Sequence, residues 1–239
     1  MAIATPTFTG FEPDAIDFLA ELAMNNDREW FNPRKAEYER LLRTPMEALV
    51  AALAERLEAR DIPLRADPRR SIFRIYRDTR FAKDKSPYKT NLGASFPWLR
   101  PGPDGQPVVA EAMAHANGGY FNFQPGEMYV GGGMWMPEKA RLDAFRRAVV
   151  GEPDRVRAAL EEAGFVAAFG SVSAHEHLKR VQPGFPPDHP NAELLRYKDV
   201  VFGRNLSDEE VLSPALPDTL ADAYAAGMPV FRFLDTIQA

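Results

Sequence analysis

The segment Tyr120-Phe121-Asn122-Phe123-Gln124-Pro125-Gly126-Glu127-Met128-Tyr129-Val130 predicts a β-hairpin. Side chains alternate in character over residues 120–123, turn-forming residues follow at 124–127, and extended chain resumes at 128–130. A connection this short favours antiparallel pairing, because parallel strands need a long crossover. We therefore expect an antiparallel sheet at the centre of the fold.

Other segments on both sides of this hairpin also have strand character. Residues 71–77 are rich in β-branched and aromatic side chains, and Phe73, Ile75 and Arg77 share one face at period two. Further strands are expected at residues 92–98 and 108–116 before the hairpin, and at residues 200–202 after it.

The N-terminal part of the chain shows helical periodicity. Apolar residues recur at helical spacing after Pro13, and two pairs of a capping residue and a proline follow, Asn32-Pro33 and Thr44-Pro45. We expect three helices here, the last of which runs to about Arg60.

From Pro137 onward the chain is mostly helical again. Apolar periodicity predicts helices over residues 138–149 and 153–163, and Gly164 can end the second of them. Ser207 and Glu210 form a capping-box pattern at the start of another helical region. Shorter helical segments are expected at residues 191–197 and 219–226, and a final apolar segment follows at residues 230–237.

This order of elements predicts an α+β fold, in which a central, mainly antiparallel sheet is flanked by N-terminal and C-terminal helices in a single domain. We expect a tail over residues 1–9 and one domain over residues 10–239. Within that domain, residues 10–62 are helical, residues 63–135 are mainly strands and residues 136–239 are mainly helical.

Composition excludes several classes of protein. The 239 residues are 45% hydrophobic and 11% aromatic, which is enough for a sizeable core. The chain has no cysteine, which excludes a disulfide framework, a thiol nucleophile and a thiolate metal site. The sequence shows neither a secretory signal nor an apolar run of the ~20 residues that a membrane span needs, so we expect a cytoplasmic protein without a membrane partner.

Residues 77–89 hold the densest concentration of charge, and we call this segment the basic loop. Its five basic and two acidic residues carry a charge of 5 − 2 = +3, in a chain whose net charge is −5. Arginine can hold a phosphate or carboxylate through a bidentate fork, and lysine acts as a compact point charge. We therefore expect a phosphorylated or other anionic small molecule to bind here, with Phe81 and Pro87 as apolar anchors of the loop. The expected contacts are Arg77, Arg80, Lys83, Lys85, Tyr88 and Lys89, with Trp135 as a stacking face.

Two other interpretations of the basic loop stay open. It could belong to a non-enzymatic module that binds single-stranded nucleic acid or an acidic protein, although the overall acidity counts against nucleic acid. It could instead be purely structural, with cations paired to its own aspartates or to helix carboxylates such as Glu37 or Glu39. An enzyme would use Asp78 or Asp84 as a general base beside the cations, but catalysis and oligomeric state are left open.

No metal and no cofactor are expected. Only His175 and His177 are spaced so that they could bind a metal together, and a polar loop is the preferred interpretation of that segment, whereas His115 and His189 are isolated. The run Gly131-Gly132-Gly133 lacks the P-loop and dinucleotide-binding patterns. We expect a bulge where the sheet bends there.

Residues 73–90 resemble the signature of the bacterial and fungal family catalogued as domain of unknown function 2461. Further similarity lies at Gly10-Phe11, at residues 26–31, at 125–135 and at 194–198, so that the resemblance covers nearly all of the chain. It implies the boundaries and the single domain, and no mechanism. Some members of the family carry histidine at two positions that hold Asn91 and Asn122 here, which argues further against metal chemistry.

Overall fold

The computed structural model of the protein describes residues 7–80, 82–109 and 117–237. Its centre is a four-stranded antiparallel sheet with the strand order β1-β4-β5-β6. These strands are β1 (Leu92–Pro97), β4 (Asn117–Phe123), β5 (Tyr129–Met134) and β6 (Val200–Asn205). A separate ribbon pairs β2 (Leu99–Pro101) with β3 (Pro107–Val109). The predicted α+β fold with a central antiparallel sheet is confirmed.

The predicted hairpin is the pair β4 and β5. Asn122 lies opposite Tyr129, and Phe121 lies opposite Val130. The connection is closed by the Glu127 amide, which donates to the Gln124 carbonyl at 2.9 Å. Local sequence determined this register, because the alternation on each side of the turn sets which face each side chain takes.

The segment 71–77 is not the regular strand that its composition predicts. It lies extended beside β1, where the Phe73 amide donates to the Gly93 carbonyl at 2.9 Å, but its ladder is reduced to isolated bridges. The expected common face is also wrong, because Ile72 and Ile75 are buried whereas Phe73 is exposed. Of the strand predicted at 108–116, only its first residues are described, as the end of β3.

The N-terminal helices begin with α1 (Asp14–Met24). The helical path that follows is continuous through α2 (Arg28–Phe31), a 3₁₀ turn, α3 (Lys35–Tyr38), a π turn and α4 (Thr44–Ala59). The predicted caps at Asn32 and Thr44 are therefore wrong, since both residues have helical backbone. Pro33 lies in the 3₁₀ turn, and Pro45 is the second residue of α4, so neither missing N–H ends the helical path.

The path starts instead at Asp27, whose carboxylate accepts a hydrogen bond from the Trp30 amide at 2.8 Å. This is the usual contact of an N-cap side chain.

Helices dominate the C-terminal part of the chain. The predicted capping box opens α9, because the Ser207 amide donates to Glu210 Oε2 at 2.9 Å and the Glu210 amide donates to Ser207 Oγ at 3.2 Å. Gly164 does not end α6 but lies in the first turn of α7. The helices are α5 (Lys139–Gly151), α6 (Pro153–Leu160), α7 (Ala163–Phe169), α8 (Ala192–Leu195), α9 (Asp208–Leu212), α10 (Leu216–Ala226) and α11 (Met228–Thr236).

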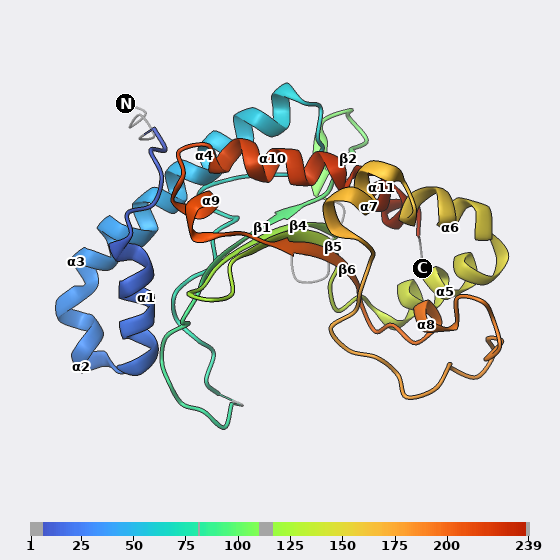
Figure 1. Cartoon of the computed structure of the whole chain (residues 1–239), viewed down its shortest axis with the longest axis horizontal. Helices are drawn as coiled ribbons and strands as arrows, with labels where there is room; N and C mark the ends of the chain where they lie inside the picture. The colour runs from blue at the N-terminus through green and yellow to red at the C-terminus, as the bar shows by residue number, and fades with distance from the viewer. Residues whose placement is uncertain (1–6, 81, 110–116, 238–239) are drawn as a thin grey trace.

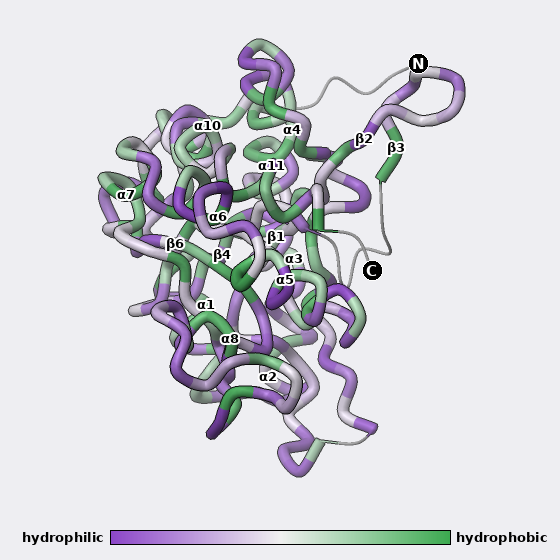
Figure 2. The backbone as a smooth tube through the Cα atoms, turned by 90° about the vertical axis from the view of Figure 1, so that its right-hand side faces the viewer, coloured by the Kyte–Doolittle hydropathy of each residue, from purple (hydrophilic) through white to green (hydrophobic). Residues whose placement is uncertain are grey.

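One face of the sheet packs against C-terminal helices, with α4 beside α10 (Figure 1). A Cβ atom on Gly119 would lie 2.8 Å from the Tyr224 ring of α10, and one on Gly132 would lie 2.5 Å from the Phe231 ring of α11. Figure 2 shows the hydrophobic residues of α11 next to the strands. One hydrophobic cluster extends from Phe8 to Ile237, so part of the predicted tail contributes to the core.

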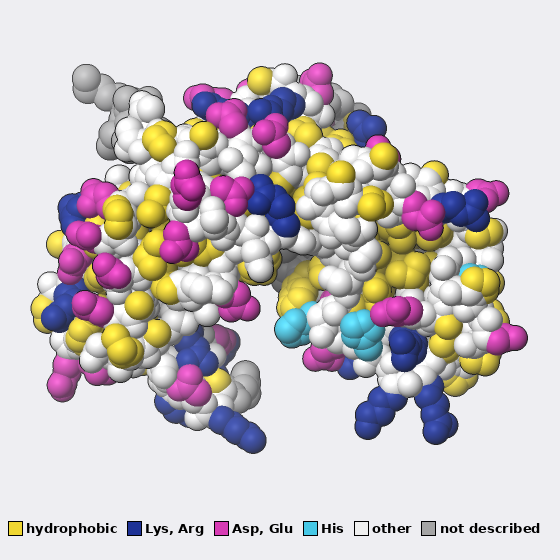
Figure 3. Space-filling model, in the orientation of Figure 1, with side chains coloured by type: hydrophobic (Ala, Val, Ile, Leu, Met, Phe, Trp, Pro, Cys, Tyr) yellow, Lys and Arg dark blue, Asp and Glu magenta, His cyan; other side chains and the backbone are white. Residues whose placement is uncertain are grey.

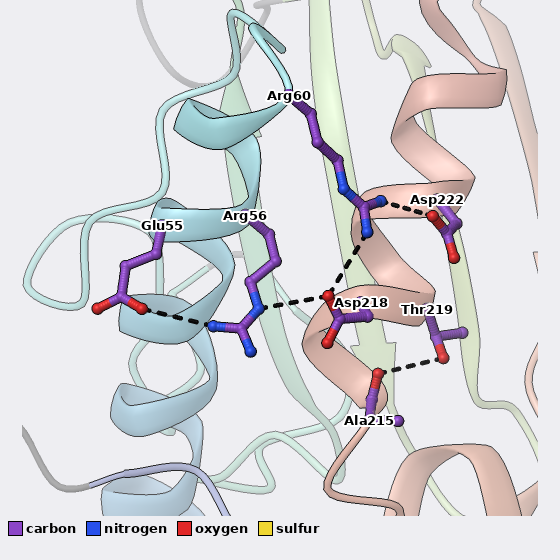
Figure 4. A network of polar contacts seen from close by, with 7 residues as sticks. All are labelled: Glu55, Arg56, Arg60, Ala215, Asp218, Thr219 and Asp222. Atoms are coloured by element: carbon purple, nitrogen blue, oxygen red, sulfur yellow. Dashed lines mark hydrogen bonds and ion pairs between the residues drawn. The ribbon is translucent and has the colours of Figure 1, made fainter.

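Ion pairs join α4 to α10 at the surface (Figure 4). Asp218 accepts from Arg56 at 3.4 Å and from Arg60 at 3.5 Å, although these residues are 162 and 158 positions away in the sequence. The side chains are partly exposed, so each pair contributes about 0–1 kcal/mol. Among the described helices, none is long and apolar enough to span a membrane.

Candidate functional site

The basic loop leaves the edge of the sheet as an irregular hairpin that projects away from α10 and α11 (Figure 1). A bridge between Tyr76 and Tyr88 closes its base, and the Lys89 amide donates to the Ile75 carbonyl at 2.7 Å. Figure 3 shows basic side chains projecting where the loop lies. Phe81 is outside the described residues.

Most charges near the tip of the loop have partners within the loop itself. Arg77 forms an ion pair with Asp84, and Arg80 pairs with Asp78 at 2.6 Å. Lys85 Nζ donates to the Thr79 carbonyl at 2.9 Å. None of the ion pairs found in the described residues joins the loop to Glu37 or Glu39.

These contacts also lower the pKa of the two aspartates in the loop. The hydrogen bond from Arg80 lowers the pKa of Asp78, and the hydrogen bonds from Arg77 and Ser86 lower that of Asp84. A carboxylate with a lowered pKa is a weak base. The geometry therefore does not favour either residue as a general base at neutral pH.

Tyr88 holds the base of the loop against the N-terminal helices. Its side chain is 2% exposed, and its ring stacks on Phe31 with centroids 4.1 Å apart. Asn26 clamps the Tyr88 backbone, since it donates to the carbonyl at 3.0 Å and accepts from the amide at 3.0 Å. Tyr88 thus fixes the position of the loop and offers no free ring face to a ligand.

Trp135 and the basic loop lie at opposite ends of the sheet. Trp135 follows Met134, which pairs with Asn117 and Val200, whereas the chain leaving the loop enters β1 at Leu92, opposite Phe123. The Trp135 ring contacts the His175 ring, with centroids 5.1 Å apart. The structure does not bring Trp135 to the other predicted contacts.

Lys89, at the foot of the loop, differs from the cations near the tip. Its ammonium lies over the Phe73 ring, 4.9 Å from the centroid, and the side chain is partly buried. Burial lowers the pKa of Lys89, and the nearby charge of Arg74 lowers it further. Within the part of the chain that the structure describes, no carboxylate pairs with Lys89.

A polar network lies beside Lys89 on the sheet face that points away from α10 and α11. Asn91 Nδ2 donates to Asn122 Oδ1 at 2.7 Å, and the Tyr120 hydroxyl lies 3.3 Å from the same oxygen. Asn122 Nδ2 in turn donates to the Glu127 carbonyl at 2.6 Å. The Tyr120 and Tyr129 rings are 5.4 Å apart, and burial raises the pKa of both hydroxyls. The hydroxyls therefore stay neutral and can donate as well as accept.

Phe73 joins Lys89 to this network. Its ring centroid is 6.0 Å from that of Tyr120. The two rings can approach because Gly93 lies between them, where a Cβ atom would be 2.9 Å from the Tyr120 hydroxyl and 3.2 Å from Phe73. Figure 3 shows a hollow on this side of the sheet, between the loop and the lobe that carries the histidines. We call this group the foot site, and its members are Phe73, Lys89, Asn91, Tyr120, Asn122 and Tyr129.

Sequence reasoning found only part of the foot site. Lys89 is among the predicted contacts, and Asn91 and Asn122 stand out through the family resemblance. Strand periodicity alone accounts for Phe73, Tyr120 and Tyr129, so that periodicity does not mark them as site residues. A usable signal was present in β4, where polar Asn122 shares with Tyr120 the face that alternates with buried Phe121 and Phe123.

The glycine run of β5 has a packing role. A Cβ atom on Gly131 would lie 2.2 Å from the Phe202 carbonyl oxygen of β6, and Gly133 has a φ of +122°. Neither position tolerates a side chain without movement of the neighbouring strand.

The described residues contain no group of three or more histidine, aspartate or glutamate side chains that could hold a metal ion. His177 packs against Tyr197, with centroids 5.0 Å apart, while His175 packs against Trp135, so the two histidines contact different aromatic rings. His115 lies outside the described residues.

A family model described as conserved hypothetical protein (DUF2461) matches residues 14–233. The chain belongs to this family. No curated protein and no solved structure matches it. In this DUF2461 chain, the matched region includes both the basic loop and the foot site. Asn91 and Asn122, which the matched region also includes, are hydrogen-bonded neighbours.

Proposed function

We propose that the protein binds a small organic anion, with a phosphate or carboxylate group, at the foot of the basic loop. The observation that carries this proposal is the partly buried ammonium of Lys89, which lacks a carboxylate partner among the described residues while Arg77 and Arg80 have one each. Burial disfavours a charge that is not compensated, and a bound anion would supply the compensation. The neighbouring hydroxyl and amide groups would orient the ligand.

The contacts available at the foot site suit a metabolite-sized ligand of moderate affinity. A hydrogen bond to a charged group contributes about 1.5–3 kcal/mol, and a neutral one about 0.5–1.5 kcal/mol. One ammonium contact with two or three neutral contacts gives about 3–7 kcal/mol before ordering costs. This corresponds to dissociation constants from roughly 10 μM to several millimolar.

Separate substitutions at the foot and at the tip of the loop test the proposal. We expect Lys89→Gln to weaken binding of a sugar phosphate or citrate at least tenfold, because it removes the charge and keeps much of the side chain. The double variant Lys83→Ala/Lys85→Ala should change the affinity by less than twofold. Isothermal titration calorimetry would measure both, with thermal shift as a check on folding.

The possible outcomes distinguish binding at the foot of the loop from binding at its tip. Loss of binding in the double variant but not in Lys89→Gln would assign the ligand to the tip and refute the proposal. A single-stranded oligonucleotide as the better ligand, with affinity that falls steeply with salt, would favour the nucleic-acid alternative. Equal anion binding by all three proteins would show that the loop is structural.

The pH dependence of binding gives a second prediction. The folded protein holds the pKa of Lys89 below its usual value of about 10.4, and the anion binds the charged form. Affinity should therefore fall as the pH rises through this lowered pKa, and the fall should begin at a lower pH than an ordinary lysine would give. Titrations between pH 7 and 10 would show it. Lys89→Arg, which keeps its charge over this range, should give a flat profile, and an equally steep profile in this variant would contradict the assignment.

A further inference from the structure

The sheet face at the foot site presents neutral polar side chains from four adjacent strands. Cross-strand pairing places Asn122, Tyr129 and Asn205 in one row, and Ser95 and Tyr120 in the next. All of them point to the side opposite α10 and α11, because side chains alternate along each strand. Gly131 and Gly203 continue the second row without side chains, and of the two only Gly203 is exposed.

Two of these polar side chains have unused hydrogen-bonding capacity. Ser95 Oγ is buried and makes no hydrogen bond to any residue that the structure describes. A buried hydroxyl without a partner is disfavoured, so a bound water or a ligand hydroxyl that reached Ser95 Oγ would be stabilised there. The Asn205 side chain is exposed, and within residues 7–80, 82–109 and 117–237 its carboxamide makes no hydrogen bond.

The chemistry of these groups narrows the class of ligand. Hydroxyl and carboxamide groups both donate and accept, which matches the hydroxyl groups of a ligand. Lys89 and the nearby, exposed Arg74 supply two positive charges, which suits one carboxylate or one phosphate group, whereas a nucleic-acid strand would need a longer run of free cations. The rings of Phe73 and Tyr120 add apolar surface beside the polar groups, as in typical small-molecule sites.

We infer that the ligand of the foot site is a hydroxylated organic anion, either a sugar acid or a sugar monophosphate. This inference rests on the proposed function and adds the recognition of hydroxyl groups by Ser95, Tyr120 and the asparagines. A site that hydrogen-bonds hydroxyl groups discriminates strongly against analogues that lack them, because its own polar groups are then left unpaired.

Matched probes test this discrimination in the whole protein. Glucuronate and glucose 6-phosphate carry both features, cyclohexanecarboxylate and inorganic phosphate carry only the anionic group, and glucose carries only the hydroxyls. Calorimetric titration should show the first two binding at least tenfold more tightly than the other three. Lys89→Gln should bring glucuronate close to the affinity of glucose.

Two variants remove single hydroxyls from the site. Tyr120→Phe should weaken glucuronate binding at least fivefold and leave cyclohexanecarboxylate unchanged. Ser95→Ala should act in the same direction without loss of stability, because Ser95 Oγ loses no hydrogen bond to the described residues. Trp135→Phe, at the far end of the sheet, is the control and should alter neither ligand.

The result that overturns the inference differs from the one that overturns the proposed function. Equal, Lys89-dependent binding of glucuronate and cyclohexanecarboxylate would overturn the hydroxylated ligand and leave the anion site standing. The same conclusion follows if Tyr120→Phe and Ser95→Ala both bind glucuronate as tightly as the unchanged protein does. Absence of Lys89-dependent binding for all the anions would overturn both.

Discussion

Replacing Arg146 by methionine is expected to lower the free energy of unfolding by about 3–5 kcal/mol. Arg146 is 2% exposed, and its guanidinium lies at the junction of α5 with the segment around α8. Nε donates to the Leu195 carbonyl at 2.9 Å, and one terminal nitrogen donates to the Tyr197 carbonyl at 2.8 Å. The other terminal nitrogen donates to Asp143 at 2.8 Å and to Gln182 at 2.9 Å.

The effect is large because the substitution leaves buried polar groups without a hydrogen-bond donor. Methionine fills much of the space, but two carbonyl groups, an amide oxygen and part of a carboxylate lose their donor in a region that water reaches poorly. Denaturation in urea would measure the change. Arg147→Met is the matched control, because Arg147 is the exposed neighbour on the same helix, and its effect should stay within about 0.5 kcal/mol. Similar midpoints for the two variants would contradict the role assigned to Arg146.

Gly131→Ala is expected to destabilise the protein by about 3 kcal/mol or more, or to prevent folding. The added Cβ atom would lie 2.2 Å from the Phe202 carbonyl oxygen and 2.8 Å from Gly203 Cα. Both atoms belong to the backbone of β6, so no side-chain rotation can relieve the contact. Either β6 moves away from β5 or the pair loses hydrogen bonds.

Gly151→Ala is the control for this second experiment. Gly151 ends α5, and a Cβ atom there would meet nothing within 4 Å. Alanine should therefore stabilise the protein by up to about 1 kcal/mol, through its helix propensity and a less flexible unfolded chain. If both alanines changed the unfolding midpoint alike, the close approach of β5 and β6 would not be a constraint on the fold.

The parts of the fold that local sequence determines were predictable. Alternation around the turn at residues 124–127 predicts β4 and β5, and the spacing of Ser207 and Glu210 predicts the capping box. The structure of residues 71–77 was harder to predict. Phe73 is of a residue type that is usually buried in strands, and yet its side chain lies at the surface beside Lys89. Its surroundings come from β1 and β4, which local patterns do not reveal.

The candidate site, too, was only partly predictable from local sequence. The charge of the basic loop is visible in the sequence, but its pairing is not, and Arg77 and Arg80 turn out to contact aspartates of the same loop. The network of Asn91, Tyr120 and Asn122 depends on the register between β1 and β4, whose paired residues are 21 to 31 positions apart. Such a cluster appears only once the strands are paired.

The position of α10 and α11 has a consequence for how a growing chain behaves on the ribosome. These helices cover the face of the sheet that carries Phe121 and Val130, yet they are made from residues 216–236, long after β1, β4 and β5. Until that late segment emerges, the nascent strands have an apolar face without its cover. Such surfaces attract chaperones and promote aggregation. Slow translation or a premature stop shortly before α10 should therefore favour aggregation over a partly active product.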